Sequence, residues 1–372
     1  MKKKSILMFV VMAALCCLAG CSNAKAAGTE EKASEKLSIV TTIFPEYDWV
    51  REIVGTNDAE ITMLLDNGVD LHSFQPTAQD ILKISACDMF IYVGGESDEW
   101  VEDALAEATN KDMVVINLLD SLGDRVKAEE IVEGMEHEHD HDHDADEHDG
   151  DHDHEEADEH DGDHDHEEAD EHDGDHDHEE ADEHDEDHDH EHEEEMDEHV
   201  WLSLNNASFL CDVIAEQLKT LDPEHADSYA ANVSAYKEKL SELDGQYRAA
   251  VEASSVDTLL FGDRFPFRYL VDDYGLSYYA AFAGCSAESE ASFETIVFLA
   301  EKTDELKLPA IMTIEGKTHR IAETVRDNTA SKDQKILTLD SLQSVTSEDV
   351  KAGTTYLSVM QSNLEVLKEA LQ

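Results

Sequence analysis

Short apolar runs and amphipathic stretches alternate along the chain from Leu37 onward. Residues 37–43 are rich in β-branched side chains and predict a strand, and Phe44-Pro45 opens a predicted helix with proline in its first turn. Further strands are expected at 59–65, 88–93, 113–116, 257–262, 277–282, 309–314 and 335–339. Further helices are expected at 77–85, from Asp98, at 205–221, 223–251, 266–274, 292–306 and 317–329, and from Ser347. This alternation predicts parallel sheets with ligand sites at the carboxyl ends of the strands.

The predicted helix in the middle of the chain is unusually long. Apolar residues recur at helical spacing along it, at Val233, Tyr236, Leu240, Leu243 and Tyr247. At about 1.5 Å per residue it extends about 40 Å, enough to run along two lobes. We therefore predict an α/β protein with two mostly parallel sheets joined by this single helix, and a ligand cleft between the lobes. The boundaries are an N-terminal lobe at 37–221, the linking helix at 222–253 and a C-terminal lobe at 254–372.

The first twenty residues have the pattern of a secretory leader, with three lysines followed by an apolar run from Ile6 to Ala19. The run is too short to favour a membrane span. It ends in Leu-Ala-Gly-Cys, the pattern of a bacterial lipoprotein signal, so lipid attachment is expected at Cys21. Residues 1–20 would then be removed, and residues 21–36 would tether the protein to the extracytoplasmic face of the cell membrane.

Residues 134–198 are dominated by His, Asp and Glu, and residues 137–199 hold eighteen of the 21 histidines. The twelve-residue repeat ADEHDGDHDHEE has no apolar position, which predicts a solvated loop without a packed core. Closely spaced imidazoles flanked by carboxylates are typical of weak, exchangeable sites for divalent metals. The accessory metal-binding histidines are expected to be His137, His139, His141, His143, His152, His154, His164, His166, His176, His178, His188 and His190.

The formal charge of −64 is divided between this loop and the rest of the chain. The loop holds 38 of the 90 acidic residues and no basic residue, and −26 remains for the other residues. Because both parts are acidic, the composition argues against nucleic-acid binding and favours cations.

Six cysteines are present, and Cys16, Cys17 and Cys21 belong to the leader or the anchor. The other three, Cys87, Cys211 and Cys285, form no C-x-x-C motif, and an odd number allows at most one internal disulfide. We expect buried or unpaired thiols at these positions rather than metal ligands.

Four residues stand near predicted strand ends or where ordered structure resumes after the acidic loop, and we predict them as the metal ligands of the cleft. His72 follows a strand in a turn-rich loop, and His199 directly precedes Val-Trp-Leu. Asp263 and Glu315 each follow a strand of the second lobe. Two imidazoles with one or two carboxylates suit zinc, and they are acceptable to manganese.

Two segments carry a family resemblance. The segment GVDLHSFQPT at 68–77 resembles the G-x-x-P-H-x-x-E-P-T loop of zinc and manganese ABC-transporter substrate-binding proteins, and EHVWL at 198–202 resembles their D-P-H-V-W-L motif. Zinc-type members commonly carry a His-rich acidic insert before the second motif, as this chain does. The resemblance implies two lobes on a rigid helix, a metal in the cleft and delivery to a membrane permease. It also makes His72 and His199 the first two ligands.

The chain departs from the family where a further ligand is expected. The family motif S-H-D-A-F is matched by Phe261-Gly262-Asp263-Arg264-Phe265, which puts glycine at the ligand position, so Asp263 is the proposed substitute. Glu315 matches the acidic position near the last ligand, and Glu288 or Glu290 would be alternatives.

The sequence therefore predicts a monomeric, lipid-anchored zinc receptor without catalytic activity, which passes Zn²⁺ to an ABC permease. A manganese receptor, or a lipid-anchored metal buffer acting through the His-rich loop, is the alternative. A metalloenzyme is disfavoured, because the sequence offers no H-E-x-x-H helix and no evident general base.

Overall fold

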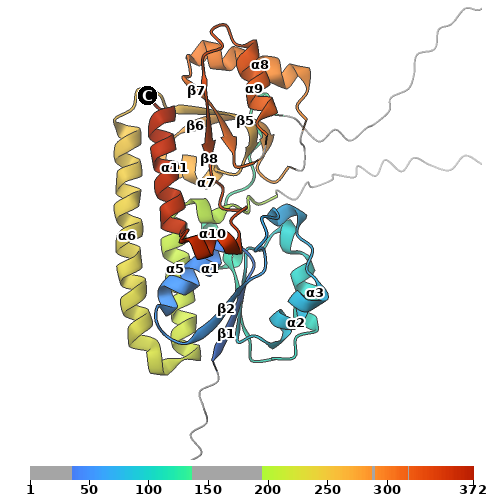
Figure 1. Ribbon diagram of the computed structural model, residues 1–372, viewed down its shortest axis with the longest axis vertical. Coiled ribbons are helices and arrows are strands. Elements are labelled where there is room, and N and C mark those ends of the chain that lie inside the picture. The colour runs from blue at the N-terminus through green and yellow to red at the C-terminus, as the bar shows by residue number, and fades with distance from the viewer. Residues whose placement is uncertain (1–35, 136–194, 287–289, 317) are drawn as a thin grey trace, which may run out of the picture. The chain divides into compact units, whose positions relative to one another are not determined.

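The computed structural model describes residues 36–135, 195–286, 290–316 and 318–372 (Figure 1). The chain divides into two units, Met1–Lys36 and Leu37–Gln372, and every element below belongs to the second. The predicted signal peptide, Cys21 and the accessory histidines from 137 to 190 lie outside the described residues. Within the described part, no helix is long and apolar enough to cross a membrane.

The first lobe contains a parallel sheet of four strands in the order β2-β1-β3-β4. The strands are β1 Leu37–Thr41, β2 Ala59–Met63, β3 Met89–Tyr92 and β4 Val114–Asn117. The helices between and after them are α1 Phe44–Val54, α2 Ala78–Ala86, α3 Trp100–Ala106 and α4 Leu118–Leu122.

The second lobe repeats this plan with a parallel sheet in the order β6-β5-β7-β8. The strands are β5 Thr258–Phe265, β6 Ser277–Ala283, β7 Ala310–Ile314 and β8 Lys335–Leu339. The helices are α7 Arg268–Tyr274, α8 Phe293–Leu306 and α9 Arg320–Asn328. The fold class predicted from the alternation of strands and helices is thus confirmed.

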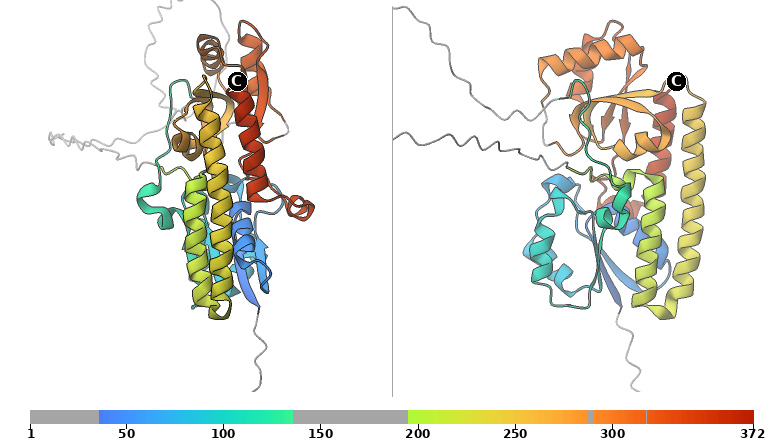
Figure 2. Two further views of the ribbon diagram at one scale, coloured as in Figure 1. Left: turned by 90° about the vertical axis from the view of Figure 1, so that its left-hand side faces the viewer. Right: turned by 180° about the vertical axis from the view of Figure 1, so that it is seen from behind.

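One long helix connects the lobes, as predicted. α6 Ala226–Glu252 runs beside α5 Leu204–Leu221 at the first lobe and continues along the second (Figure 2). The apolar residues predicted on its inner face are all buried there. α6 contributes to one continuous core that includes side chains of both lobes, so the helix is a shared wall rather than a free linker.

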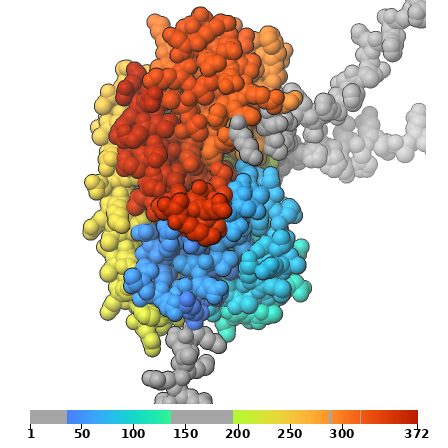
Figure 3. All heavy atoms as spheres, in the orientation of Figure 1, coloured from blue at the N-terminus to red at the C-terminus, as the bar shows by residue number. Residues whose placement is uncertain are grey.

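The C-terminal segment differs from the single helix that was predicted from Ser347. It forms two helices, α10 Ser347–Ala352 and α11 Tyr356–Ala370, because Gly353 takes a left-handed conformation (φ 104°) that ends the first. α10 lies against the first lobe, where the Ser347 N–H donates to the Asp66 carbonyl at 2.9 Å (Figure 3). The Tyr356 N–H donates to Asp48 at 2.8 Å. The end of the chain therefore fastens the second lobe to the first.

Three carboxyl groups are buried near the carboxyl end of the first sheet, on Glu46, Asp98 and Glu198. Asp98 accepts a hydrogen bond from the Gly94 N–H at 3.0 Å. Burial raises the pKa of Asp98 to about 7, with the charge of Glu198 adding to the effect. Burial likewise raises the pKa of Glu46 and of Glu198. This part of the core is therefore easier to assemble when its acids are protonated.

Replacing Asp98 by asparagine should change the pH dependence of stability. The folded protein binds a proton at Asp98 below about pH 7, whereas the unfolded chain does so only near its ordinary pKa of 3.8. Asp98 should therefore contribute stability that increases as the pH falls from 7 to 5, by up to about 1.4 kcal/mol per pH unit. D98N should lack this contribution, as measured by urea unfolding of metal-free protein. The exposed Asp103→Asn is the control, and parallel wild-type and D98N curves would refute the assignment.

β5 packs unusually close to α9 at Gly262. A Cβ atom at this position would lie 2.5 Å from the Cα atom of Ala322, a contact that side-chain movement cannot relieve. The contrast is Gly245 in α6, where a Cβ atom would meet nothing within 4 Å.

The two glycines should therefore respond oppositely to alanine. G262A should lower the free energy of unfolding by about 1–3 kcal/mol, because the helix must move off the sheet. G245A should raise it by about 0.5–1 kcal/mol through higher helix propensity. Denaturant unfolding of both variants measures this, and equal effects would contradict the close packing of β5 and α9.

Candidate metal site

A cavity of about 440 Å³ opens between the lobes. The first lobe contributes Asp70 and His72 to its wall, and the second contributes Asp263, Arg264 and Glu315 among others. Arg264 and Asp70 form an ion pair across the cleft at 2.6 Å. Although burial opposes it, the guanidinium of Arg264 lowers the pKa of Asp70, which stays ionised. This pair ties the two sides of the cleft together beside His72.

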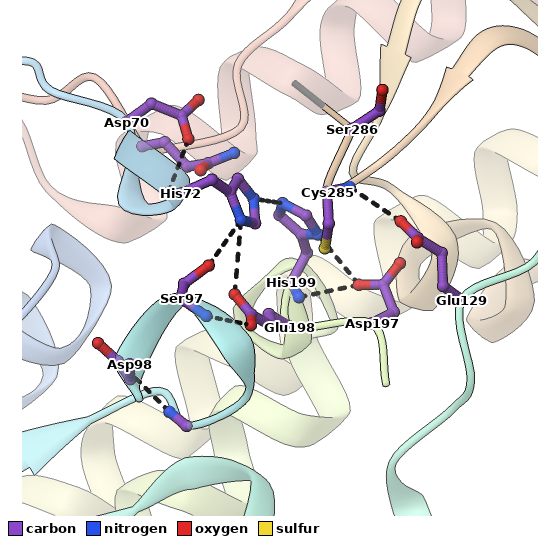
Figure 4. Close-up of polar contacts among 12 residues, drawn as sticks. Asp70, His72, Ser97, Asp98, Glu129, Asp197, Glu198, His199, Cys285 and Ser286 are labelled. Carbon is purple, nitrogen blue, oxygen red and sulfur yellow. Dashed lines mark hydrogen bonds and ion pairs between the residues drawn. The ribbon is translucent and has the colours of Figure 1, made fainter. Parts of the chain in front are cut away.

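His72 stands in a short 3₁₀ turn, Leu71–Ser73, that follows β2. The Asp70 carboxylate caps this turn by accepting from the His72 N–H at 3.1 Å. The ring atom Nδ1 lies 2.7 Å from the hydroxyl of Ser97 and 3.6 Å from the carboxylate of Glu198. These contacts fix the ring so that its Nε2 atom faces the ring of His199 (Figure 4).

His199 is fully buried just before the 3₁₀ turn Val200–Leu202. One oxygen of Asp197 accepts from the His199 N–H at 2.8 Å and lies 3.1 Å from the ring Nδ1. The adjoining Trp201 is also held, since its indole N–H donates to the Ser341 carbonyl at 2.8 Å. His199 is thus held in place next to the turn Val200–Leu202, which directly follows the His-rich sequence.

The two histidines present their remaining ring nitrogens to each other. Nε2 of His72 lies 3.2 Å from Nε2 of His199, as Figure 4 shows. Two nitrogen ligands at roughly 2.0–2.1 Å from a tetrahedral zinc ion would lie about 3.3 Å apart. Burial, reinforced by the neighbouring His199, lowers the pKa of His72 to about 4. His72 is therefore neutral near pH 7, the state in which imidazole binds metal.

A third possible ligand is Cys285, in the turn after β6. Its Sγ atom and one nitrogen of each histidine all lie within 4.8 Å of one another. All three cysteines of the described residues are free thiols, and Cys87 and Cys211 are buried outside this group. Burial raises the pKa of the Cys285 thiol, and Glu129 adds to this effect. The sequence predicts a buried or unpaired thiol at Cys285 and not a metal ligand; its position after a predicted strand is the one signal that points to the site.

The structure does not bring Asp263 and Glu315 into this group. β5 continues through Asp263 to Phe265 with a register shift, so the strand does not end where it was predicted to. The Asp263 oxygens accept from the backbone N–H groups of Arg264 and Ile314. Glu315 accepts from the N–H and hydroxyl of Ser341 at 2.7 and 2.6 Å. Both carboxylates line the cavity, but both are engaged in holding loops.

The structure describes one of the two alternative acids predicted from the sequence. Glu290 is exposed, and Glu288 lies outside the described residues. Burial raises the pKa of both Asp263 and Glu315, as expected for carboxylates that are largely removed from water.

Comparison with known proteins identifies the family of the chain. The family model described as "ZnuA: Zinc-uptake complex component A periplasmic" matches residues 39–370. The zinc-binding lipoprotein AdcA of Streptococcus pneumoniae is 31% identical over 373 residues, covering 99% of this chain and 61% of the relative. The high-affinity zinc uptake system protein ZnuA of Bacillus subtilis is 26% identical over 371 residues, covering 100% of this chain and 99% of the relative.

A solved structure shares the fold. The Zn(II)-bound ZnuA-like domain of Streptococcus pneumoniae AdcA has a TM-score of 0.62 and 25% identity, covering 90% of this chain and 99% of that domain. The chain spans only 56–61% of the length of its streptococcal AdcA relatives. With a family match over nearly all of residues 37–372, the chain belongs to the family of zinc-uptake complex component A proteins, the ZnuA family.

Proposed function

We propose that this protein is an extracytoplasmic receptor that captures Zn²⁺ in the interlobe cleft and delivers it to the permease of an ABC importer. The observation that carries the proposal is the buried pair of imidazoles, which face each other at 3.2 Å with their other nitrogens already held by oxygen atoms. Histidine ligands commonly have this outer hydrogen bond, which fixes the tautomer and aims the free nitrogen at the metal. The relatives named for zinc binding and zinc uptake support the choice of ion.

In this proposal the protein binds its cargo without catalysis and acts as a monomer. The family is that of a component of an uptake complex, which is consistent with a receptor role. The ion pair between Arg264 and Asp70 links the lobes beside the site. Capture and release of the ion would therefore accompany opening and closing of the cleft.

Membrane attachment through Cys21 is also a proposal. The segment that would carry the lipid has the sequence of a lipoprotein signal, and the pneumococcal relative is named a lipoprotein. The permease would then meet the receptor at the outer face of the cell membrane.

The His-rich segment would serve as an accessory metal collector. The described chain next to it is anchored, because Ala128 and Met196 form an antiparallel bridge and Asp197 contacts His199. The alternative function, a metal buffer, would place all binding in this segment and leave the lobes as a scaffold.

Deleting residues 137–192 from the lipid-free protein should leave one tight zinc site. Isothermal titration should show that His72→Ala or His199→Ala in this background weakens binding by more than about tenfold, or 1.4 kcal/mol. His225→Ala is the matched control, since this exposed histidine pairs with Asp222 outside the cleft.

Each outcome separates two functions. A deletion variant without a tight site would support the metal buffer and refute the receptor. A tighter site for manganese than for zinc in the same variant would favour the manganese receptor instead.

A further inference from the structure

The position of Cys285 bears on which metals the cleft accepts. Its thiol is the only sulfur in the group of potential ligand atoms that the described residues bring within 4.8 Å of one another. Two imidazoles and a thiol converge from three separate segments, namely the loop after β2, the turn before α5 and the turn after β6. Figure 4 shows the sulfur beside the ring of His199.

The turn after β6 is packed onto the site. A Cβ atom on Gly284 would lie 3.2 Å from Cε1 of His199 and 2.8 Å from the carbonyl oxygen of Phe265, so only glycine lets this turn approach so closely. The Cys285 N–H donates to the carboxylate of Glu129 at 2.9 Å. Cys285 is therefore positioned by two independent contacts.

We propose that Cys285 is the third protein ligand of the zinc ion and that its thiolate makes the cleft prefer zinc to manganese. This inference rests on the proposed function of the cleft. On binding, the thiol transfers its proton to solvent and the sulfur donates its electron pair to the metal. Zinc accepts thiolate and imidazole ligands together, whereas manganese favours oxygen ligands. The fourth position is left for water or another small donor.

Cobalt substitution gives a spectroscopic test on the full mature chain. Co²⁺ bound by a thiolate absorbs through sulfur-to-metal charge transfer in the near ultraviolet, whereas Co²⁺ held by imidazoles and carboxylates does not. The wild-type protein should show this band with one equivalent of Co²⁺, and added Zn²⁺ should abolish it. Cys285→Ser should remove the band, whereas Cys87→Ala, which alters a thiol outside the site, should keep it.

Metal preference gives a second readout. Competition with a chromophoric chelator should show that Cys285→Ser weakens zinc binding by more than about tenfold, since a loss of this size follows even from removing outer contacts of a ligand. Cys285→Asp should lower the ratio of zinc to manganese affinity by a similar factor, because a carboxylate suits manganese. An unchanged ratio together with unchanged zinc affinity would overturn the inference.

Wild-type protein provides a test that does not depend on folding of the variants. Zinc should slow alkylation of Cys285 by iodoacetamide, mapped by mass spectrometry, and equal rates with and without zinc would overturn the assignment. The two proposals fail separately. If Cys285→Ser keeps tight zinc binding and His72→Ala loses it, only the thiolate ligand is wrong. If wild-type protein has no tight zinc site, the receptor function itself is wrong.

Discussion

The structure depends on holding two imidazoles against each other in a buried cleft. Nothing in water would keep the Nε2 atoms of His72 and His199 3.2 Å apart, since two ring nitrogens share at most one hydrogen bond and the ordering of both rings costs entropy. The protein offsets this cost through Ser97, Glu198 and Asp197, which hold the Nδ1 atoms. Burial, which lowers the pKa of His72 to about 4, then keeps that ring uncharged. In the proposed receptor, a divalent cation would accept electron pairs from the Nε2 atoms of both rings.

Contacts between the lobes hold the two sides of that cleft in place. Trp201 lies in the turn that follows His199. Its indole N–H donates to the carbonyl of Ser341 in the second lobe, and its own carbonyl accepts from the Tyr356 hydroxyl at 2.6 Å. α6 supplies a common wall whose apolar face belongs to the core of both lobes. Together these contacts limit how far the lobes can separate, so the side chains of His72, His199 and Cys285 stay close to one another.

Most of the fold was predictable because parallel α/β architecture leaves a local signal. Apolar runs bounded by turns predicted each strand of the described residues, and the buried face of α6 followed from its helical spacing. The break at Gly353 was missed because a glycine inside a helical pattern can be tolerated, and only its left-handed backbone reveals the end of α10. The continuation of β5 through Asp263 was missed because the register shift depends on pairing with β6.

Of the proposed site, His72 and His199 were predictable because they lie in recognisable local motifs. Cys285 joins them through the packing of the β6 turn against His199, a tertiary contact that spacing along the chain does not encode. The entropy of ordering the cleft side chains is spent when the protein folds, so a metal ion that binds there does not have to supply it. In the proposed receptor, this preorganisation would favour a tight site in the cleft over the weaker, exchangeable sites that the His-rich sequence predicts.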